Sequence, residues 1–286
     1  MANPYEEARK SFRLDIPPNP NFVTHIFDKY ASDPRNLEAL YWVSANTPPQ
    51  IRHLSYAYFA ERSHRVACAL DKLGLRKGDR VLMILPRLPE WWELALGMLR
   101  MGVVVVPSTM LLVSKDIEYR LEASGARAFI GSTESAHHFL KVKNVPKTLE
   151  FTILVEDYYN SSPLPESKYK WNIYSEMIGQ FKEGTKWRGT QFHAEDPSII
   201  YFTSGTIGMP KMVQHTQISY PMGCVITGKY WLKLEPGKVY WNTSEQGWAK
   251  AAWSFFGTYV SSPCLPIHSS SPLQLTHCPH VLSAFG

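Results

Sequence analysis

The chain has 286 residues, of which 44% are hydrophobic and 19% are charged, a balance that is typical of globular proteins and excludes intrinsic disorder. The net charge is +5, and because lysine and arginine form no basic run, the sequence does not favour nucleic-acid binding. No apolar run approaches the roughly 18 residues that a transmembrane helix requires.

The first part of the chain is predicted to form a polar segment outside the core, followed by alternating helices and strands. Residues 1–20 are polar and rich in proline near their end, so we expect no core element there. Apolar residues recur at helical spacing in 55–73, and proline begins a second helix at 89–100. Strands are predicted at 81–85 and at 103–106, the latter apolar enough to be buried on both faces.

The alternation continues toward the centre of the chain. We predict a helix at 115–123, strands at 126–130 and 151–155, a short helix at 173–178 and a strand at 198–202. This order predicts an α/β fold with a doubly wound, mostly parallel sheet. Ligands of such sheets bind at the carboxyl ends of the strands.

The most informative stretch follows the last of these strands. It reads Tyr201-Phe-Thr-Ser-Gly-Thr-Ile-Gly-Met-Pro-Lys211. Glycines let backbone N–H groups approach phosphate oxygens, hydroxyl groups add donors, and the lysine adds a positive charge. We therefore predict an ATP phosphate-binding loop made of Thr203, Ser204, Gly205, Thr206, Ile207, Gly208, Met209, Pro210 and Lys211.

The spacing within this loop excludes a Walker loop. A Walker loop needs four residues between its glycines and a Ser or Thr directly after the lysine, whereas Gly205 and Gly208 are three positions apart and Met212 follows Lys211. A purely structural strand-to-helix turn is the alternative interpretation.

The loop resembles the phosphate-binding signature of the AMP-forming acyl-CoA synthetases, which more often carry Thr or Ser at the position of Ile207. Further segments are similar to the medium-chain branch of that family: Leu85-Pro-Arg-Leu-Pro-Glu-Trp-Trp92, Asp116-Ile-Glu-Tyr-Arg-Leu121, Pro210-Lys-Met-Val-Gln-His215 and Ser244-Glu-Gln-Gly-Trp248. The resemblance covers roughly residues 20 to 256, about the first half of a typical member.

The resemblance implies that residues 21–256 form an incomplete N-terminal adenylation domain. Members convert a carboxylic acid and ATP, with Mg²⁺, into an acyl-adenylate and pyrophosphate, and CoA then yields acyl-CoA and AMP. A medium-chain fatty acid or an aromatic acid is the expected substrate.

Particular residues gain expected roles from the same resemblance. Trp248 is expected to border the acid pocket, with plain packing as the alternative, and Gln246 stands where a smaller residue is more usual. Trp91, Trp92 and His215 are expected to be mainly structural. The catalytic residues stay unknown, because the family's catalytic lysine and magnesium-binding glutamate have no counterpart in this sequence.

Residues 257–286 break the pattern. No Asp, Glu, Lys or Arg occurs after Lys250, and we expect this tail not to be family structure and the C-terminal lid domain to be absent. Five tail residues could ligate a metal, but their spacing matches no zinc pattern: Cys264, His268, His277, Cys278 and His280.

Two expectations follow for the protein in the cell. Although it resembles a synthetase, the chain alone is expected to be inactive as one. The alternative function is that of a non-catalytic product that forms a homo-oligomer or pairs with a full-length homologue. Its four cysteines include no Cys-x-x-Cys pair and its N-terminus has early acidic residues, which favours a reducing compartment, the cytoplasm, with the mitochondrion as the alternative.

Overall fold

The fold is described from a computed structural model. It covers residues 3–13, 16–44, 48–156, 163, 166–203, 208–235, 239–241, 244–251 and the backbone of 265–269.

A seven-stranded sheet with the strand order β7-β6-β5-β3-β4-β8-β9 forms the centre of the molecule. All neighbouring strands are parallel except β8 and β9, which are antiparallel. The strands are β3 (Arg80–Ile84), β4 (Val104–Pro107), β5 (Ala128–Gly131), β6 (Phe151–Leu154), β7 (Trp171–Ile173), β8 (Pro197–Thr203) and β9 (Lys211–Thr216). The predicted doubly wound, mostly parallel α/β fold is thus confirmed.

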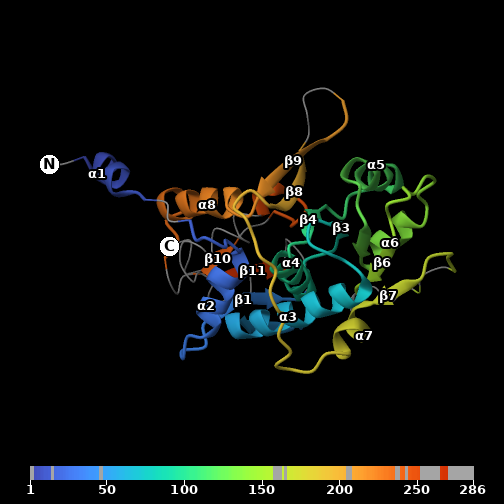
Figure 1. Ribbon diagram of the computed structural model, residues 1–286, viewed down its shortest axis with the longest axis horizontal. Helices are drawn as coiled ribbons and strands as arrows, with labels where there is room; N and C mark the ends of the chain where they lie inside the picture. The colour runs from blue at the N-terminus through green and yellow to red at the C-terminus, as the bar shows by residue number, and fades with distance from the viewer. Residues whose placement is uncertain are drawn as a thin grey trace.

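Helices cover both faces of this sheet (Figure 1). α3 (Tyr56–Leu73) and α4 (Pro89–Met101) pack into one hydrophobic cluster, and α5 (Ser114–Ser124) and α6 (Thr133–Phe139) pack into the other. The short α7 (Tyr174–Gly179) joins the first cluster. Two apolar layers therefore enclose strands that are buried on both sides, which explains the continuous Val and Ile runs of the sequence.

The predicted helix ends are confirmed at α3. Ser55 caps the helix because its hydroxyl accepts a hydrogen bond of 3.1 Å from the Tyr58 backbone N–H. Gly74 ends it with a φ of +120°, a conformation that strains any residue with a Cβ atom.

A second sheet has the order β10-β11-β1-β2. β1 (Glu38–Val43) is antiparallel to β2 (Ile51–Ser55) and parallel to β11 (Leu265–Ser269), which is parallel to β10 (Val239–Trp241). β11 belongs to the tail that begins at residue 257, whose sequence has no strand periodicity; the other tail residues lie outside the described part of the chain.

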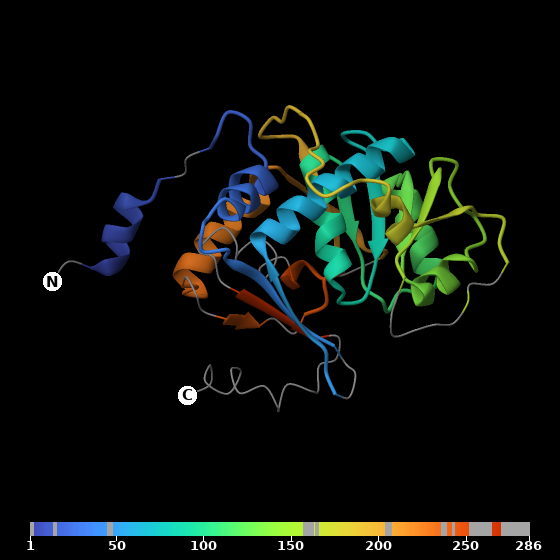
Figure 2. The same ribbon diagram turned by 90° about the horizontal axis from the view of Figure 1, so that it is seen from below.

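The remaining elements lie near the N-terminus and after β9. α1 (Pro4–Ser11) stands apart from the body of the molecule in Figure 2 and contributes no buried side chain. The other elements are a π-helical turn (Val23–Phe27), α2 (Asp28–Ala31), α8 (Ser219–Ile226), a second π-helical turn (Thr227–Trp231) and a 3-10 turn (Ala249–Ala251).

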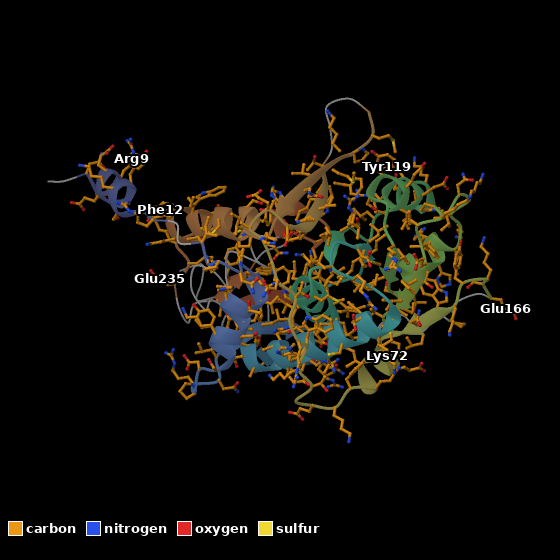
Figure 3. All side chains as sticks on the ribbon, viewed as in Figure 1. Arg9, Phe12, Lys72, Tyr119, Glu166 and Glu235 are labelled. Atoms are coloured by element: carbon orange, nitrogen blue, oxygen red, sulfur yellow. The ribbon has the colours of Figure 1, made fainter. Side chains whose placement is uncertain are left out.

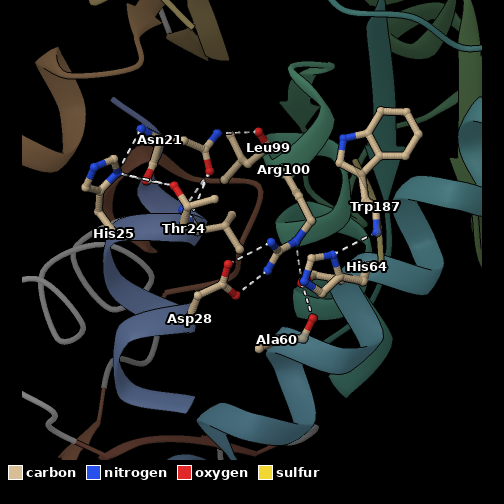
Figure 4. Close-up of polar contacts among 11 residues, drawn as sticks. Asn21, Thr24, His25, Asp28, Ala60, His64, Leu99, Arg100 and Trp187 are labelled. Carbon is tan, nitrogen blue, oxygen red and sulfur yellow. Dashed lines mark hydrogen bonds and ion pairs between the residues drawn. The ribbon is translucent and has the colours of Figure 1, made fainter. Parts of the chain in front are cut away.

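Buried polar contacts fasten residues 21–28 to α3 and α4 (Figure 4). Arg100 forms two hydrogen bonds with the Asp28 carboxylate, of 2.6 and 2.9 Å, and a third of 3.0 Å with the Ser63 hydroxyl. Asn21 donates to the backbone carbonyl of Leu99 at 2.8 Å. Because Arg100 is only 3% exposed, this ion pair fixes the N-terminal segment to the core.

The strand order creates a topological switch point. From β3 the chain crosses through α4 to β4 on one side, and from β4 it crosses through α5 back to β5 on the other side of β3. The helices that follow β3 and β4 therefore lie on opposite faces of the sheet. A crevice opens outside the carboxyl ends of such strands, where α/β folds place their ligands.

Candidate functional site

The predicted phosphate loop connects β8 and β9, the antiparallel hairpin at the edge of the large sheet. Thr203 ends β8 directly opposite Lys211, the first residue of β9. The Thr203 hydroxyl donates a hydrogen bond of 3.4 Å to the Lys211 carbonyl oxygen. Gly208 has a φ of +90°, a turn conformation that strains side-chain-bearing residues. The Lys211 side chain is exposed, so its charge is available to a ligand.

α5 holds the base of this hairpin in place. The Tyr119 hydroxyl donates a hydrogen bond of 2.7 Å to the carbonyl oxygen of Pro210, and the Tyr119 ring meets the Phe202 ring edge-on at 6.0 Å. The Arg120 guanidinium lies 4.6 Å from the centre of the Phe202 ring. Figure 3 shows Tyr119 on α5 beside the two hairpin strands. Both ends of the loop are therefore attached to a rigid element.

The hairpin lies next to the switch point of the large sheet. β8 is parallel to β4, with Val105 opposite Ile199. Continuing that register by four residues brings Thr109, just after β4, level with Thr203 at the end of β8. The ends of the predicted phosphate loop and the residues after β4 thus lie on the same edge of the sheet.

The segment 244–248 is seated on the end of β4. The Glu245 carboxylate accepts hydrogen bonds of 2.6 Å from the Thr109 hydroxyl and 2.5 Å from the Met110 backbone N–H. A Cβ atom at Gly247 would lie 2.1 Å from the Thr109 backbone nitrogen, so only glycine allows this close approach. These contacts join two segments that are far apart in the sequence.

Arg87 lies just after the carboxyl end of β3, on the same edge of the sheet. Its backbone carbonyl accepts a hydrogen bond of 2.7 Å from the Trp42 indole N–H. Burial lowers the pKa of the Arg87 guanidinium, while the nearby Glu245 carboxylate acts to raise it. Arg87 and Glu245 therefore bring a positive and a negative group near each other in a partly desolvated setting, where charges interact strongly.

The structure places most of the described residues of the predicted site together. Thr203, Pro210 and Lys211 lie at the hairpin base, with Gly208 and Met209 in the adjoining turn. Placement of the loop's other members lies outside the described residues: Ser204, Gly205, Thr206 and Ile207.

Trp248 lies in the turn that contacts the end of β4, where its backbone N–H donates to the Glu245 carbonyl oxygen at 3.0 Å. Its side chain is 53% exposed, so it is accessible to a ligand and is not part of the hydrophobic core.

The histidine and the tryptophan pair do not join the site. His215 pairs with Ile199 in the hairpin, away from the loop, and its ring lies 4.2 Å from the Tyr220 ring. Trp91 and Trp92 are each 1% exposed and belong to the core. All three therefore have structural environments, as the sequence analysis expected.

Sequence reasoning assigned no role to Arg87, Thr109, Tyr119 and Glu245. Three of the four lie within segments that resemble the medium-chain synthetases, which was the available signal. Thr109 follows a predicted buried strand, a position that α/β folds often use for ligands.

The described residues include neither a candidate metal cluster nor a helix suited to spanning a membrane. No cluster of three or more His, Cys, Asp or Glu side chains with the arrangement of a metal site occurs among them. The described helices include none with the length and hydropathy of a membrane span.

Comparison with known proteins gives relatives of one kind. The human mitochondrial acyl-coenzyme A synthetase ACSM5 is 34% identical over 248 residues, which is 86% of this chain and 41% of the relative. The rat mitochondrial acyl-coenzyme A synthetase ACSM4 is 35% identical over 269 residues, 92% of this chain and 44% of the relative. The chain thus spans less than half the length of these two relatives.

Solved structures confirm the fold. A Brucella canis acyl-CoA synthetase superimposes with a TM-score of 0.78 at 20% identity, covering 93% of this chain and 48% of that one. The anthranilate CoA ligase AuaEII, in complex with anthranoyl-AMP, has a TM-score of 0.73 at 22% identity, covering 88% of this chain and 45% of that one. Residues 27–282 match the family described as AMP-binding enzyme, and the chain is a member of that family.

Proposed function

We propose that the chain binds ATP through the loop 203–211 and serves the AMP-forming activation of a carboxylic acid. The observation that supports this proposal is the position of the two ends of the loop: Thr203 and Lys211 are paired at the carboxyl end of β8, beside the switch point of the sheet. Membership of the AMP-binding enzyme family supports the same ligand.

The chemical task of the loop is to stabilise charge on the departing pyrophosphate. The carboxylate of the acid attacks the α-phosphorus of ATP, the bond to the bridging oxygen breaks, and pyrophosphate leaves. Lys211 and the donors of the loop would offset the developing negative charge, which requires groups held in position beforehand. The Tyr119 contact to Pro210 supplies such positioning.

The proposed co-substrates are ATP, entering as its magnesium complex, and CoA. The relatives are named acyl-coenzyme A synthetases, and we propose a medium-chain fatty acid or an aromatic acid as the substrate, with Trp248 beside it. The same names carry the word mitochondrial, which favours the mitochondrion over the cytoplasm as the location of this protein.

A comparison of nucleotides tests the proposal. A loop that grips the β- and γ-phosphates should bind ATP at least about tenfold more tightly than AMP, because one charge-assisted contact contributes at least about 1.5 kcal/mol. Isothermal titration of the purified chain with ATP, ADP and AMP in the presence of Mg²⁺ measures this order. Equal affinities for the three nucleotides would contradict a phosphate-binding role.

The acid-activating step needs its own assay. Acid-dependent release of AMP and pyrophosphate from ATP, measured with and without CoA, reports the complete reaction. We expect this chain alone to bind ATP without forming acid-dependent product, and release of AMP and pyrophosphate would contradict that expected inactivity.

A second candidate function is pairing with another synthetase chain. β9 is an edge strand of the large sheet, and it carries the exposed apolar side chains Met212 and Val213, which are 41% and 39% exposed. Unprotected apolar edges favour association. Light scattering should then give a mass above 32.6 kDa, and a clean monomer that does not copurify with a full-length synthetase would contradict it.

A further inference from the structure

Gln246 is a buried amide whose polar atoms have no hydrogen-bond partner among the described residues. The side chain is 2% exposed, and neither its Oε1 nor its Nε2 forms a hydrogen bond with any residue that the structure describes. A glutamine amide can donate two hydrogen bonds and accept two. Buried polar groups in folded proteins are almost always hydrogen-bonded, so an amide with both ends unpaired needs an explanation.

Gln246 lies beside the carboxyl end of β4. Its two neighbours in the chain are both fixed against the residues that follow β4: Glu245 through its hydrogen bonds to Thr109 and Met110, and Gly247 through its close approach to the Thr109 backbone. The residue lies in the turn that Glu245 and Trp248 close. Gln246 is therefore held beside the proposed acid site by contacts on either side.

The charges nearby limit what the amide can bind. Glu245 places a carboxylate one residue away, which disfavours a second anion at this point. A neutral amide, with one donor end and one acceptor end, complements a neutral group that also donates or accepts, such as a hydroxyl or an amine. A purely alkyl chain would leave both ends of the amide unpaired.

We propose that Gln246 is a specificity-determining residue that hydrogen-bonds a hydroxyl or amino substituent on the substrate acid. This inference rests on the proposed function, because it needs a substrate acid bound beside the turn at the end of β4. A site built to pair a polar substituent rejects the analogue that lacks it, since rejection leaves a buried polar group unsatisfied. The acid would then be a hydroxylated or aminated one rather than a plain alkanoic acid.

The first test measures the folded chain without ligand. Gln246→Met keeps the length of the side chain and removes its polar atoms. If the amide is unpaired, the variant should unfold at the same temperature as the wild type or above it. A lower midpoint would show that the amide already has a partner inside the protein and would overturn the inference.

The second test measures binding of stable acyl-sulfamoyl adenosines, which mimic the acyl-adenylate. Matched pairs are used: benzoyl with hydroxybenzoyl and aminobenzoyl, and octanoyl with hydroxyoctanoyl. We expect the wild type to bind the best substituted analogue about tenfold to a hundredfold more tightly than its plain partner, and Gln246→Met to lose that preference.

Gln217→Met is the matched control. Gln217 is also buried, at 4% exposure, but its Nε2 donates to the Pro197 carbonyl oxygen at 3.4 Å, at the opposite end of β8. This variant should lose stability and keep the wild-type preference.

The outcomes separate the two proposals. Equal wild-type affinity for plain and substituted analogues, or a preference that survives in Gln246→Met, overturns the role of Gln246 while the proposed function stands. If the wild type binds none of the analogues, the proposed function fails at this site and the inference fails with it.

Discussion

Glu245 accepts a 2.6 Å hydrogen bond from the Thr109 hydroxyl, although 136 positions separate the two residues in the chain. The same carboxylate holds the Met110 backbone N–H. This relationship fixes the turn that carries Gln246 and Trp248 on the end of β4.

Replacing Glu245 by Gln should weaken the attachment of this turn to the end of β4. An amide keeps the shape but loses the charge that strengthens both hydrogen bonds, so we expect a loss of about 1–3 kcal/mol in the free energy of unfolding. Urea denaturation measures the change, and Glu166→Gln, at an exposed position, is the control with no expected effect. An unchanged midpoint for Glu245→Gln would show that the contact does not hold the turn.

Removing the Tyr119 hydroxyl should loosen the phosphate loop. Tyr119→Phe keeps the ring against Phe202 and deletes only the hydrogen bond to Pro210, which contributes about 1 kcal/mol. We expect faster amide hydrogen exchange at the hairpin base and ATP affinity lower by about threefold to tenfold. Tyr5→Phe, at a residue that is 66% exposed, should change neither quantity; equal behaviour of the two variants would contradict the anchoring role.

The Arg100–Asp28 pair should be essential for stability. Arg100→Leu leaves the Asp28 carboxylate without its two hydrogen bonds in a partly buried place, which typically costs about 3–5 kcal/mol. Arg9→Gln breaks the exposed pair with Glu6 instead and should cost less than about 1 kcal/mol. Denaturant unfolding compares the two, and similar losses would show that burial does not strengthen the Arg100 pair.

Stability should fall in mild acid because of His64. Burial lowers the pKa of His64 from its ordinary 6.5 to about 4, and its Nδ1 accepts a hydrogen bond of 3.0 Å from the Trp187 backbone N–H. The unfolded chain therefore binds a proton more readily, so the stability that neutral His64 contributes is complete above pH 6.5 and is lost as pH falls toward 4.

His64→Gln removes this titration. The difference in unfolding free energy between wild type and variant should shrink by roughly 1–3 kcal/mol between pH 7 and pH 4. A difference that is constant with pH would show that His64 has the same pKa in the folded and unfolded chain.

Sequence periodicity predicted the central fold because local signals and tertiary packing agree there. The helix predicted at 55–73 corresponds to α3, and the strands predicted at 81–85 and 103–106 correspond to β3 and β4 within two residues. Each has a strong apolar pattern and a clear stop signal.

Other elements gave no such signal. β1 and β2 form the antiparallel hairpin of the second sheet, and β11 joins them across more than 200 positions. β9 follows the phosphate loop as an exposed edge strand, whose mixed polar and apolar residues do not alternate. These strands exist through pairing with distant partners, which a local pattern does not record.

The candidate site also contains one feature with a local sequence signal and one that depends on distant residues. The loop from Thr203 to Lys211 was recognised in the sequence because its motif consists of consecutive residues, and its phosphate-binding role stays a prediction. The contact between Glu245 and Thr109 could not be predicted, because it depends on the strand order that brings the ends of β3, β4 and β8 to one edge of the sheet.

The most direct test of the account is the ATP affinity of Lys211→Ala. Lys211 is the exposed cation at the hairpin base, and loss of a charge-assisted contact of about 1.5–3 kcal/mol should weaken ATP binding by roughly tenfold to a hundredfold. Lys182→Ala, at an exposed lysine on another part of the surface, should bind ATP like the wild type. Isothermal titration at fixed Mg²⁺ measures all three proteins. A wild-type affinity in Lys211→Ala would contradict the claim that this loop binds the phosphates of ATP.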